Sequence, residues 1–372
     1  MLAITSPRAY AHEAGLRIRA GQFIKPYATH IRIFTSPQAW QAVNPELSQS
    51  LEENGIRWQL DYLEGECTEQ AIASLKHHIE QQGAELLLAI GGGRVLDAAK
   101  AAASQLPTVT LVNFATQAAT CAAWSPIAII YNEQGGHLRS QPLGKMPELV
   151  LVDSEVIARS DVRYLKAGIV DALAKYYEFR PYQQHNPDDL ALDLKVMTAR
   201  QALDTFRQQG DAAILACQQQ RVTPELVRVI DATIVLAGLA NSVRDLLPTP
   251  GFAHAIHNRL THLPELHHWL HGEKVGFSLL VQSLMEHDGV ADAELLALLR
   301  HYDMPLKLPV LRGDRHSALR NIAQQIKFPQ ACAERLPFSV SARALEQALL
   351  ATDSLFKRAA ARLFTLQTRN RS

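Results

Sequence analysis

Histidine side chains are concentrated in one short stretch of the chain. Six of its 15 histidines lie between positions 254 and 271. Neutral imidazole is the commonest metal ligand in proteins, so this density predicts a metal site. Spacing alone does not select which two or three residues coordinate the metal. The candidates are His254, His257, His262, His267, His268 and His271.

One carboxylate lies in an otherwise apolar segment that we expect to be helical. Asp171 is surrounded by Ala, Val and Leu in Ala167–Lys175. Burying a carboxylate in such surroundings is unfavourable unless it is paired or bound to a metal. Two interpretations are open: Asp171 completes the metal site, or it pairs with Lys175, four residues further along the helix.

Three consecutive glycines, Gly91 to Gly93, separate an apolar segment from one rich in Ala and Leu. The first segment, Glu85–Ile90, is typical of a buried strand, and the second, Arg94–Gln105, of a helix. Glycines allow a ligand to approach the backbone, and the N-terminus of the following helix attracts phosphate. The loop therefore predicts a phosphate cradle, although a tight turn without ligand would look the same. It lacks the lysine of a Walker loop, which disfavours nucleotide hydrolysis.

Strand-like and helix-like segments alternate through the first half of the chain. This alternation predicts an α/β domain with a doubly wound, Rossmann-like parallel sheet that binds ligands at the carboxyl ends of its strands. The residues Tyr131–Gly136 carry turn signals and are expected to join a hairpin. Strands are expected at Thr29–Phe34, Arg57–Leu63, Glu85–Ile90, Thr108–Asn113 and Leu149–Asp153, with helices at Pro37–Asn54, Glu69–Gln82 and Arg94–Gln105.

From about Ser154 onward nearly every segment is typical of a helix. The expected helices include Ala167–Phe179, Asp189–Gln208, Pro224–Val243 and Ser341–Leu363. The chain therefore divides into an α/β domain over residues 1–157 and an all-α domain over residues 158–372.

Composition excludes several classes of function. The 372 residues carry 37 basic and 37 acidic side chains, so no basic excess favours nucleic acid or an anionic membrane as a partner. No apolar run approaches the ~20 residues of a membrane span, and the N-terminus does not resemble a signal peptide. The four cysteines are widely spaced, which argues against a disulfide framework. We expect a cytoplasmic protein that acts on a small molecule.

Taken in order, these motifs resemble the iron-containing alcohol dehydrogenase superfamily, in particular its glycerol dehydrogenase-like branch. The resemblance spans most of the chain and implies a dehydroquinate synthase-like architecture, with a dinucleotide-binding domain, a helical catalytic domain and a metal between them. It also implies a homo-oligomer. The matching segments are Gly91–Lys100, Gly168–Lys175, His254–Asn258 and His271–Val275, together with Gly65–Thr68 and Ala115–Cys121.

The resemblance assigns roles to individual positions. It implies that Asp171, His254 and His271 bind the metal, expected to be zinc, with ferrous iron as the alternative. His257 is a candidate proton relay, or a structural histidine. Asp97 and Tyr131 fall on nucleotide-contacting positions, although a helix-turn carboxylate and a core aromatic would fit them equally. The positions implied to contact NAD or NADP are Ser36, Gly92, Gly93, Arg94, Val95, Leu96, Asp97, Thr116, Thr120, Ser125 and Tyr131.

Two positions depart from the glycerol dehydrogenase pattern. Cys121 replaces an aspartate that binds the polyol, which removes repulsion of an anionic substrate. It resembles the hydroxycarboxylate dehydrogenase A type, so we expect small 2-oxo and 2-hydroxy acids as substrates, with Asp171 and Cys121 in the substrate site. Arg244 or Lys274 is a candidate partner of the substrate carboxylate. Ser36 stands where many relatives have an aspartate that excludes a 2′-phosphate, so NADPH is expected to be accepted.

Two alternative functions remain open. One is a glycerol or polyol dehydrogenase that reduces dihydroxyacetone. The other is a binding protein that has the same fold and no turnover. Three intact ligand positions argue against the second.

Overall fold

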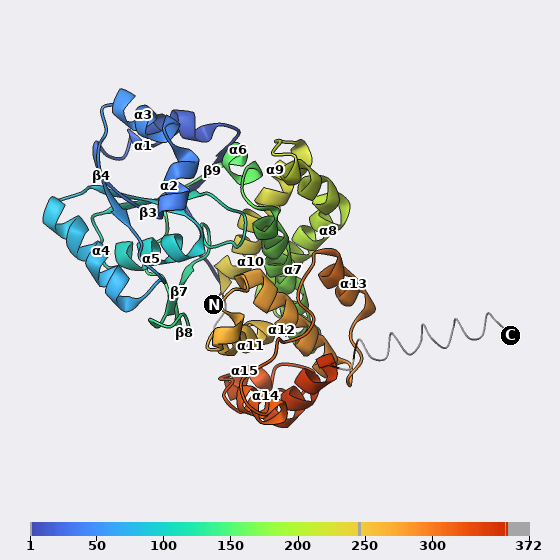
Figure 1. The fold of residues 1–372 in the computed structure, drawn as a ribbon. Helices are drawn as coiled ribbons and strands as arrows, with labels where there is room; N and C mark the ends of the chain where they lie inside the picture. Colours follow the sequence, from blue (N-terminus) through green and yellow to red (C-terminus); the bar gives the residue numbers. More distant parts are fainter. Residues whose placement is uncertain (1, 245–246, 354, 356–372) are drawn as a thin grey trace.

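The computed structural model describes residues 2–244, 247–353 and 355. In the N-terminal half, six strands form one parallel sheet (Figure 1), which confirms the predicted doubly wound architecture. Their order across the sheet is β2 (Ala9–Glu13), β9 (Leu149–Asp153), β6 (Thr110–Ala115), β5 (Leu86–Gly91), β3 (His30–Thr35) and β4 (Arg57–Tyr62). Five of these strands match predicted segments. The edge strand β2 was missed because polar Tyr10, His12 and Glu13 interrupt any apolar pattern.

Helices cover both faces of this sheet because successive side chains of a strand point to opposite sides. In β5, Leu86, Leu88 and Ile90 share one cluster with residues of η1 (Leu16–Arg19), α1 (Ala20–Ile24) and α3 (Glu46–Glu53). Leu87 and Ala89 share another with residues of α4 (Glu69–Gln82) and α5 (Gly93–Ala103). Figure 1 shows α1 and α3 on one side of the sheet and α4 and α5 on the other.

The helix predicted over Pro37–Asn54 is two helices, α2 (Pro37–Val43) and α3. Pro45 separates them, because proline has no N–H to donate and restricts the residue before it. Ser36 caps α2 by accepting a hydrogen bond from the backbone N–H of Ala39 at 3.2 Å. The predicted hairpin is confirmed as β7 (Ile127–Tyr131) and β8 (His137–Pro142).

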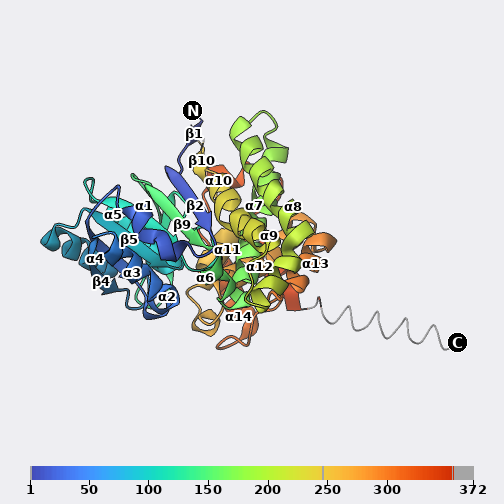
Figure 2. The same cartoon turned by 90° about the horizontal axis from the view of Figure 1, so that it is seen from above.

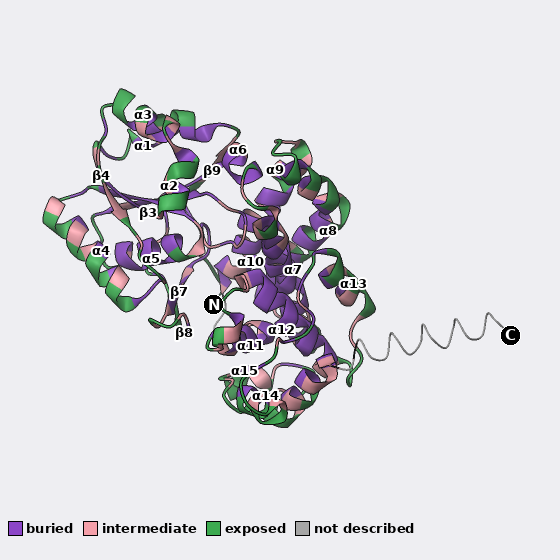
Figure 3. Ribbon diagram, viewed as in Figure 1, coloured by how far each residue is buried: buried purple, intermediate pink, exposed green. Residues whose placement is uncertain are grey.

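Three long helices form the centre of the C-terminal half: α7 (Val162–His185), α8 (Leu190–Gln218) and α12 (His271–Glu286). Figure 3 shows buried ribbon concentrated in α7 and α12. Shorter helices surround them, among them α6 (Ser154–Ala158), α9 (Pro224–Asp231), η2 (Ala232–Leu236), α10 (Ala237–Ser242), α11 (Phe252–Leu260), η3 (Pro264–Leu266), α13 (Ala293–His301), α14 (Arg315–Gln324) and α15 (Gln330–Ala333).

The predicted helix Pro224–Val243 corresponds to α9, a π-helical turn η2 and α10, and ends at Ser242. Residues 342–353 are helical as predicted, and residues 356–363 of that prediction lie outside the described residues. None of the helices within the described ranges combines the length and the apolar composition of a membrane span.

The N-terminus is attached to the helical half. Strand β1 (Ala3–Ile4) pairs with β10 (Val243–Arg244), which follows α10, and the two lie together in Figure 2. This pairing connects the start of the proposed α/β domain (residues 1–157) to a segment of the proposed all-α domain (residues 158–372). It places Arg244 at the junction between the two halves.

Candidate active site

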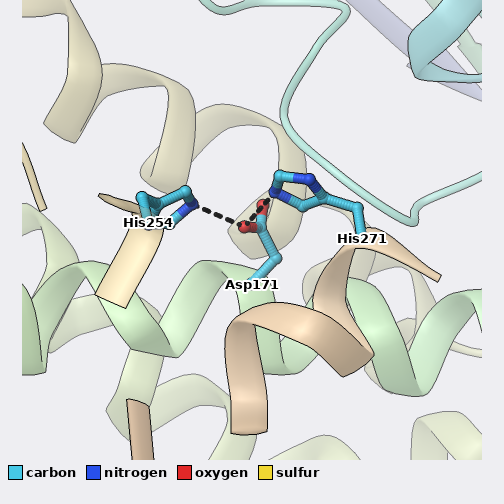
Figure 4. A group of neighbouring side chains, drawn as sticks. All are labelled: Asp171, His254 and His271. Atoms are coloured by element: carbon cyan, nitrogen blue, oxygen red, sulfur yellow. Dashed lines mark hydrogen bonds and ion pairs between the residues drawn. The ribbon is translucent and has the colours of Figure 1, made fainter. Parts of the chain in front are cut away.

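Asp171, His254 and His271 converge from three helices (Figure 4). Asp171 lies in the middle of α7, His254 in the first turn of α11, and His271 is the first residue of α12. Asp171 Oδ1 is 3.3 Å from His254 Nε2 and 3.1 Å from His271 Nε2. Their candidate ligand atoms all lie within 4.8 Å of one another. Two imidazoles and one carboxylate facing a common point fit a divalent metal with an open coordination position.

The charge of Asp171 is maintained although the residue is only 3% exposed. Burial by itself would raise the pKa of its carboxyl. The charge of Lys175 and the hydrogen bonds from the two histidines more than offset burial, so the pKa lies well below its usual value. Lys175 Nζ is 3.4 Å from Asp171 Oδ2. Asp171 therefore pairs with Lys175, and this pairing leaves Oδ1 facing the two histidines, so it is compatible with the predicted role as a metal ligand.

Glu178, one turn beyond Lys175 on α7, holds His254. Its Oε1 accepts the backbone N–H of His254 at 2.8 Å, and its Oε2 is 2.7 Å from His254 Nδ1. With Nδ1–H donating to Glu178, Nε2 is the ring nitrogen that faces Asp171, and it could bind a metal after losing its own proton. Burial lowers the pKa of His254, but Glu178 and Asp171 outweigh burial and raise it to about 9. Gly251 permits this contact, because a Cβ there would lie 2.1 Å from Glu178 Oε1.

The start of α12 is fixed by contacts with α7, and these set the position of His271. Glu273 Oε2 accepts the backbone N–H of Leu270 at 2.7 Å, and Arg163 Nε is 2.6 Å from Glu273 Oε1. Gly272 lets the two helices approach closely, because a Cβ there would lie 1.9 Å from the carbonyl oxygen of Ala167. His271 is thereby brought to the turn of α7 that carries Asp171.

His257 lies beside the three candidate ligands, and its ring centroid is 4.3 Å from that of His271. Its Nδ1 is 3.1 Å from Asn258 Oδ1, so Nδ1 is the donor and Nε2 is left as the acceptor. Burial, together with the charges of His271 and His254, holds the pKa of His257 well below its usual value. The ring is therefore neutral at pH 7.

The remaining histidines of the stretch do not join the candidate metal cluster among the described residues. His262 Nε2 is 2.9 Å from the carbonyl oxygen of His137, next to the β7–β8 hairpin. His267 and His268 follow η3 outside the cluster.

A single cleft of about 2340 Å³ contains the three candidate ligands and reaches the glycine loop. Its far wall is formed by residues that directly follow three adjacent parallel strands: Ser36 after β3, Gly92 after β5 and Thr116 after β6. Parallel strands bind ligands at this edge. The predicted cofactor positions that line the cleft are Ser36, Gly92, Gly93, Arg94, Val95, Asp97, Thr116, Thr120, Ser125 and Tyr131.

Leu96 is not among the described residues that line the cleft, so the structure lends no support to its expected cofactor contact. Its side chain is 2% exposed and packs in the core, and its backbone N–H donates to the carbonyl oxygen of Gly92 at 3.1 Å. Helical periodicity turns this position of α5 toward the protein interior. Asp97 faces the cleft and also has structural partners: it pairs with Lys100 at 2.9 Å and accepts the N–H of Ile129 at 3.1 Å.

The glycine loop allows close packing of the backbone. None of Gly91, Gly92 and Gly93 has a positive φ. A Cβ on Gly91 would lie 2.9 Å from the Cβ of Val95. The first turn of α5 can therefore approach the end of β5. Gly92 and Gly93, at the N-terminus of α5, line the cleft.

Cys121, predicted to lie in the substrate site, lines the cleft and is 5% exposed. Burial raises the pKa of its thiol, which disfavours a thiolate nucleophile. Its Sγ is 3.7 Å from Asn241 Nδ2. Arg244 and Lys274 also line the cleft.

The sequence analysis did not identify Glu178 as a site residue. A signal for it was present, because Asp171, Lys175 and Glu178 follow one another at helical spacing in an apolar helix.

Comparison with known proteins identifies relatives of the whole chain. A family model described as iron-containing alcohol dehydrogenase matches residues 7–154. A glycerol dehydrogenase of Pseudomonas putida is 32% identical over 362 residues, covering 95% of this chain and 97% of the relative. Hydroxycarboxylate dehydrogenase A of Escherichia coli K12 is 34% identical over 254 residues, covering 67% of this chain and 69% of the relative. The crystal structure of a probable glycerol dehydrogenase from Sinorhizobium meliloti 1021 superposes with a TM-score of 0.82 at 27% identity, covering 96% of this chain and 99% of that one.

Proposed function

The chain belongs to the iron-containing alcohol dehydrogenase family, and we propose that it oxidises small polyols, or reduces the corresponding hydroxyketones, with NAD(P) and a divalent metal. The observation that carries this proposal is the convergence of Asp171, His254 and His271 in the cleft that also exposes the glycine loop. A metal site and a dinucleotide site in one cleft are the two requirements of metal-assisted hydride transfer.

Different residues around the cleft have different roles in the proposed reaction. When bound, NAD(P) would supply the hydride donor or acceptor, and a divalent metal would supply a Lewis acid. Asp171, His254 and His271 would hold the metal, while the N-terminus of α5 would receive the pyrophosphate. His257 Nε2 is the atom that we assign to accept the substrate hydroxyl proton, because its Nδ1 is engaged by Asn258.

The polyol class is favoured by the extent of the similarity. The glycerol dehydrogenase of P. putida matches along almost its whole length, whereas hydroxycarboxylate dehydrogenase A matches over about two thirds. The comparisons thus favour the polyol alternative over the 2-oxo acids expected from Cys121. The 2-oxo acids stay a second candidate, supported by the uncharged thiol of Cys121 in the cleft.

Several finer features of this function stay predictions. NADPH is expected to be accepted alongside NADH because Ser36 carries no charge at the cleft. Zinc is the expected metal, although an Asp/His/His donor set also accommodates ferrous iron. A homo-oligomer and a cytoplasmic location are further predictions.

A screen of purified protein tests the proposed function. NADH and NADPH oxidation would be followed with dihydroxyacetone and with 2-oxobutanoate, after chelation and again after adding zinc or ferrous iron. Metal-dependent turnover of dihydroxyacetone supports the polyol proposal. Turnover of 2-oxobutanoate alone would replace it with the second candidate. Absence of metal binding and of turnover with either metal would contradict both and favour a non-catalytic binding protein.

A further inference from the structure

The β7–β8 hairpin is hydrogen-bonded to the end of α11, and Figure 1 shows the two elements close together. The backbone N–H of His137 donates to Thr261 Oγ1 at 2.7 Å, and His262 Nε2 donates to the carbonyl oxygen of His137 at 2.9 Å. Gly136 permits this approach, because a Cβ there would lie 2.4 Å from His262 Nδ1. These contacts join an element of the α/β half to the helix that carries His254 and His257.

The base of the hairpin is fixed to α5, whose first turn follows the glycine loop. Asp97 Oδ2 accepts the backbone N–H of Ile129 at 3.1 Å, and Lys100 Nζ donates to the carbonyl oxygen of Ile127 at 2.6 Å. Ile127, Ile129 and Tyr131 of the hairpin line the cleft. The hairpin therefore connects the expected cofactor site with α11 and is held at both ends.

Thr261 closes the last turn of α11, which contains the candidate proton relay. Its backbone N–H donates to the carbonyl oxygen of His257 at 3.1 Å, and its hydroxyl donates to that of Asn258 at 2.6 Å. Asn258 in turn holds the His257 ring through Oδ1. The Thr261 hydroxyl is thus a donor to this turn and an acceptor from His137 of the hairpin. A displacement of the hairpin tip therefore acts on the turn that orients His257.

We propose that Thr261 is a positioning residue that couples the hairpin of the cofactor site to the orientation of His257. A dinucleotide bound against the hairpin restrains it, and the hydrogen bond from His137 passes this restraint to the last turn of α11. The His257 ring is thereby ordered when the cofactor is in place. This inference rests on the proposed function, because it takes His257 as the group that transfers the proton and the hairpin as a cofactor contact. It deepens that function by naming the residue that links the two.

Kinetics of three variants test the positioning role. Thr261→Val removes the hydroxyl, so we expect kcat to fall about tenfold through misplacement of His257. The KM for NADH or NADPH should change by less than about twofold, because Asp97 and Lys100 still hold the base of the hairpin. Thr261→Ser keeps the hydroxyl and should retain kcat within about twofold of wild type.

Thr205→Val is the matched control for these kinetics. Thr205 is 3% exposed, close to the 4% of Thr261, and its hydroxyl also donates to a carbonyl oxygen of its own helix, that of Gln201, at 2.9 Å. It is not among the described residues that line the cleft, so kcat and KM should both stay at the wild-type values. Unchanged kcat in Thr261→Val, or a Thr261→Ser variant as slow as Thr261→Val, would overturn the proposal.

Hydrogen exchange separates the proposed coupling from a simple helix cap. Amide exchange in the hairpin (residues 127–142) and in the last turn of α11 (residues 257–262) would be measured on metal-free protein with and without NADH. We expect NADH to slow exchange in both segments of the wild type and of Thr205→Val, but in the hairpin alone of Thr261→Val. A residue that only capped α11 would, when replaced, speed exchange with and without NADH and leave the ratio of the two rates unchanged.

The same measurement distinguishes failure of this inference from failure of the proposed function. Slowing confined to the hairpin in the wild type, or equal slowing of residues 257–262 in wild type and Thr261→Val, would overturn the coupling and leave the dinucleotide site intact. Absence of slowing in either segment with NADH and with NADPH would contradict the dinucleotide site and therefore the proposed function. Slowing of residues 257–262 that requires the Thr261 hydroxyl supports the coupling even if neither zinc nor ferrous iron gives turnover.

Discussion

Glu178 holds His254 by two hydrogen bonds, one to its backbone N–H at 2.8 Å and one to Nδ1 at 2.7 Å. A carboxylate that orients a ligating histidine in this way fixes both the tautomer and the direction of the ring. The candidate metal site thus includes Glu178, which orients a candidate ligand without being one. Glu178 and Asp171 lie on the same helix, α7.

Replacing Glu178 should weaken metal binding without removing a ligand. We expect Glu178→Ala to lower the affinity for zinc by about 10- to 100-fold, because His254 would lose its fixed orientation. Competition with a chromophoric chelator measures this affinity. Glu286→Gln is the matched control, since Glu286 is another largely buried glutamate that does not contact a candidate ligand. Equal affinities in wild type and Glu178→Ala would contradict the orienting role.

Gly251→Ala should produce a similar defect from the opposite side of the contact. Its Cβ would lie 2.1 Å from Glu178 Oε1, so the carboxylate must move away from His254. We expect zinc affinity to fall by about tenfold, in the range found for disturbed outer-shell partners. Gly144→Ala serves as the control, because nothing lies within 4 Å of a Cβ at that position. Unchanged zinc affinity in Gly251→Ala, or an equal loss in Gly144→Ala, would refute this explanation.

Asp171→Asn should abolish stoichiometric metal binding. The amide removes the negative charge that the two histidines face, and a site with three protein ligands tolerates such a loss poorly. Metal content after dialysis, measured by atomic emission, should fall to about a tenth of the wild-type value or less. Asp97→Asn is the comparison, since Asp97 is a buried aspartate of the same cleft outside the metal cluster. Full metal content in Asp171→Asn would rule out Asp171 as a ligand.

Ser36→Asp should restrict the cofactor to NADH. The new carboxylate would repel a 2′-phosphate and accept a hydrogen bond from a 2′-hydroxyl. Aspartate also caps helices well, so α2 should keep the cap that Ser36 provides. We expect kcat/KM with NADPH to fall about 100-fold relative to NADH, measured with the same substrate. Ser36→Ala removes the cap without adding charge, and a comparable shift in that variant would contradict the electrostatic explanation.

Ionisation of Glu286, which is not a candidate metal ligand, should make the free energy of unfolding depend on pH. Burial, only partly offset by a hydrogen bond from Gln282 and the charge of Arg180, raises its pKa from about 4.5 to about 7, with Asp292 and Glu178 adding repulsion. Between these values the folded state binds more protons than the unfolded state. This contribution to stability is therefore full below pH 4.5 and is lost as pH rises through 7.

Glu286→Gln should remove this dependence. The shift corresponds to an effect of about 2–3 kcal/mol between pH 4.5 and 8. Urea unfolding at several pH values gives the difference between variant and wild type, which should grow in favour of the variant as pH rises. Glu80→Gln, at an exposed position of α4, should show no such trend. A constant difference for Glu286→Gln across the window would disprove the assignment.

Local sequence was sufficient for most of the first half of the chain. The apolar runs at Leu86–Gly91 and Leu149–Asp153 are fully buried strands of a parallel sheet, and a run of this kind needs no partner to be recognised. Helix α4 has the predicted limits because Thr68 caps its start and Gly83 its end. Edge strand β2 and the break at Pro45 were not predicted, since one depends on pairing with β9 and the other on a single residue within a helical pattern.

The sequence by itself determined which residue types could bind a metal: histidines at high density and one carboxylate in an apolar helix. It did not determine which of them meet. That choice depends on the close approach of α12 to α7 at Gly272 and on the entry of α11 beside Glu178, because His254 and His271 are separated from Asp171 by 83 and 100 residues. The pairing of β1 with β10, which places Arg244 at the junction of the two halves, is equally invisible in a linear pattern. Distances between side chains far apart in sequence are set by helix packing, which depends on every residue at the interface.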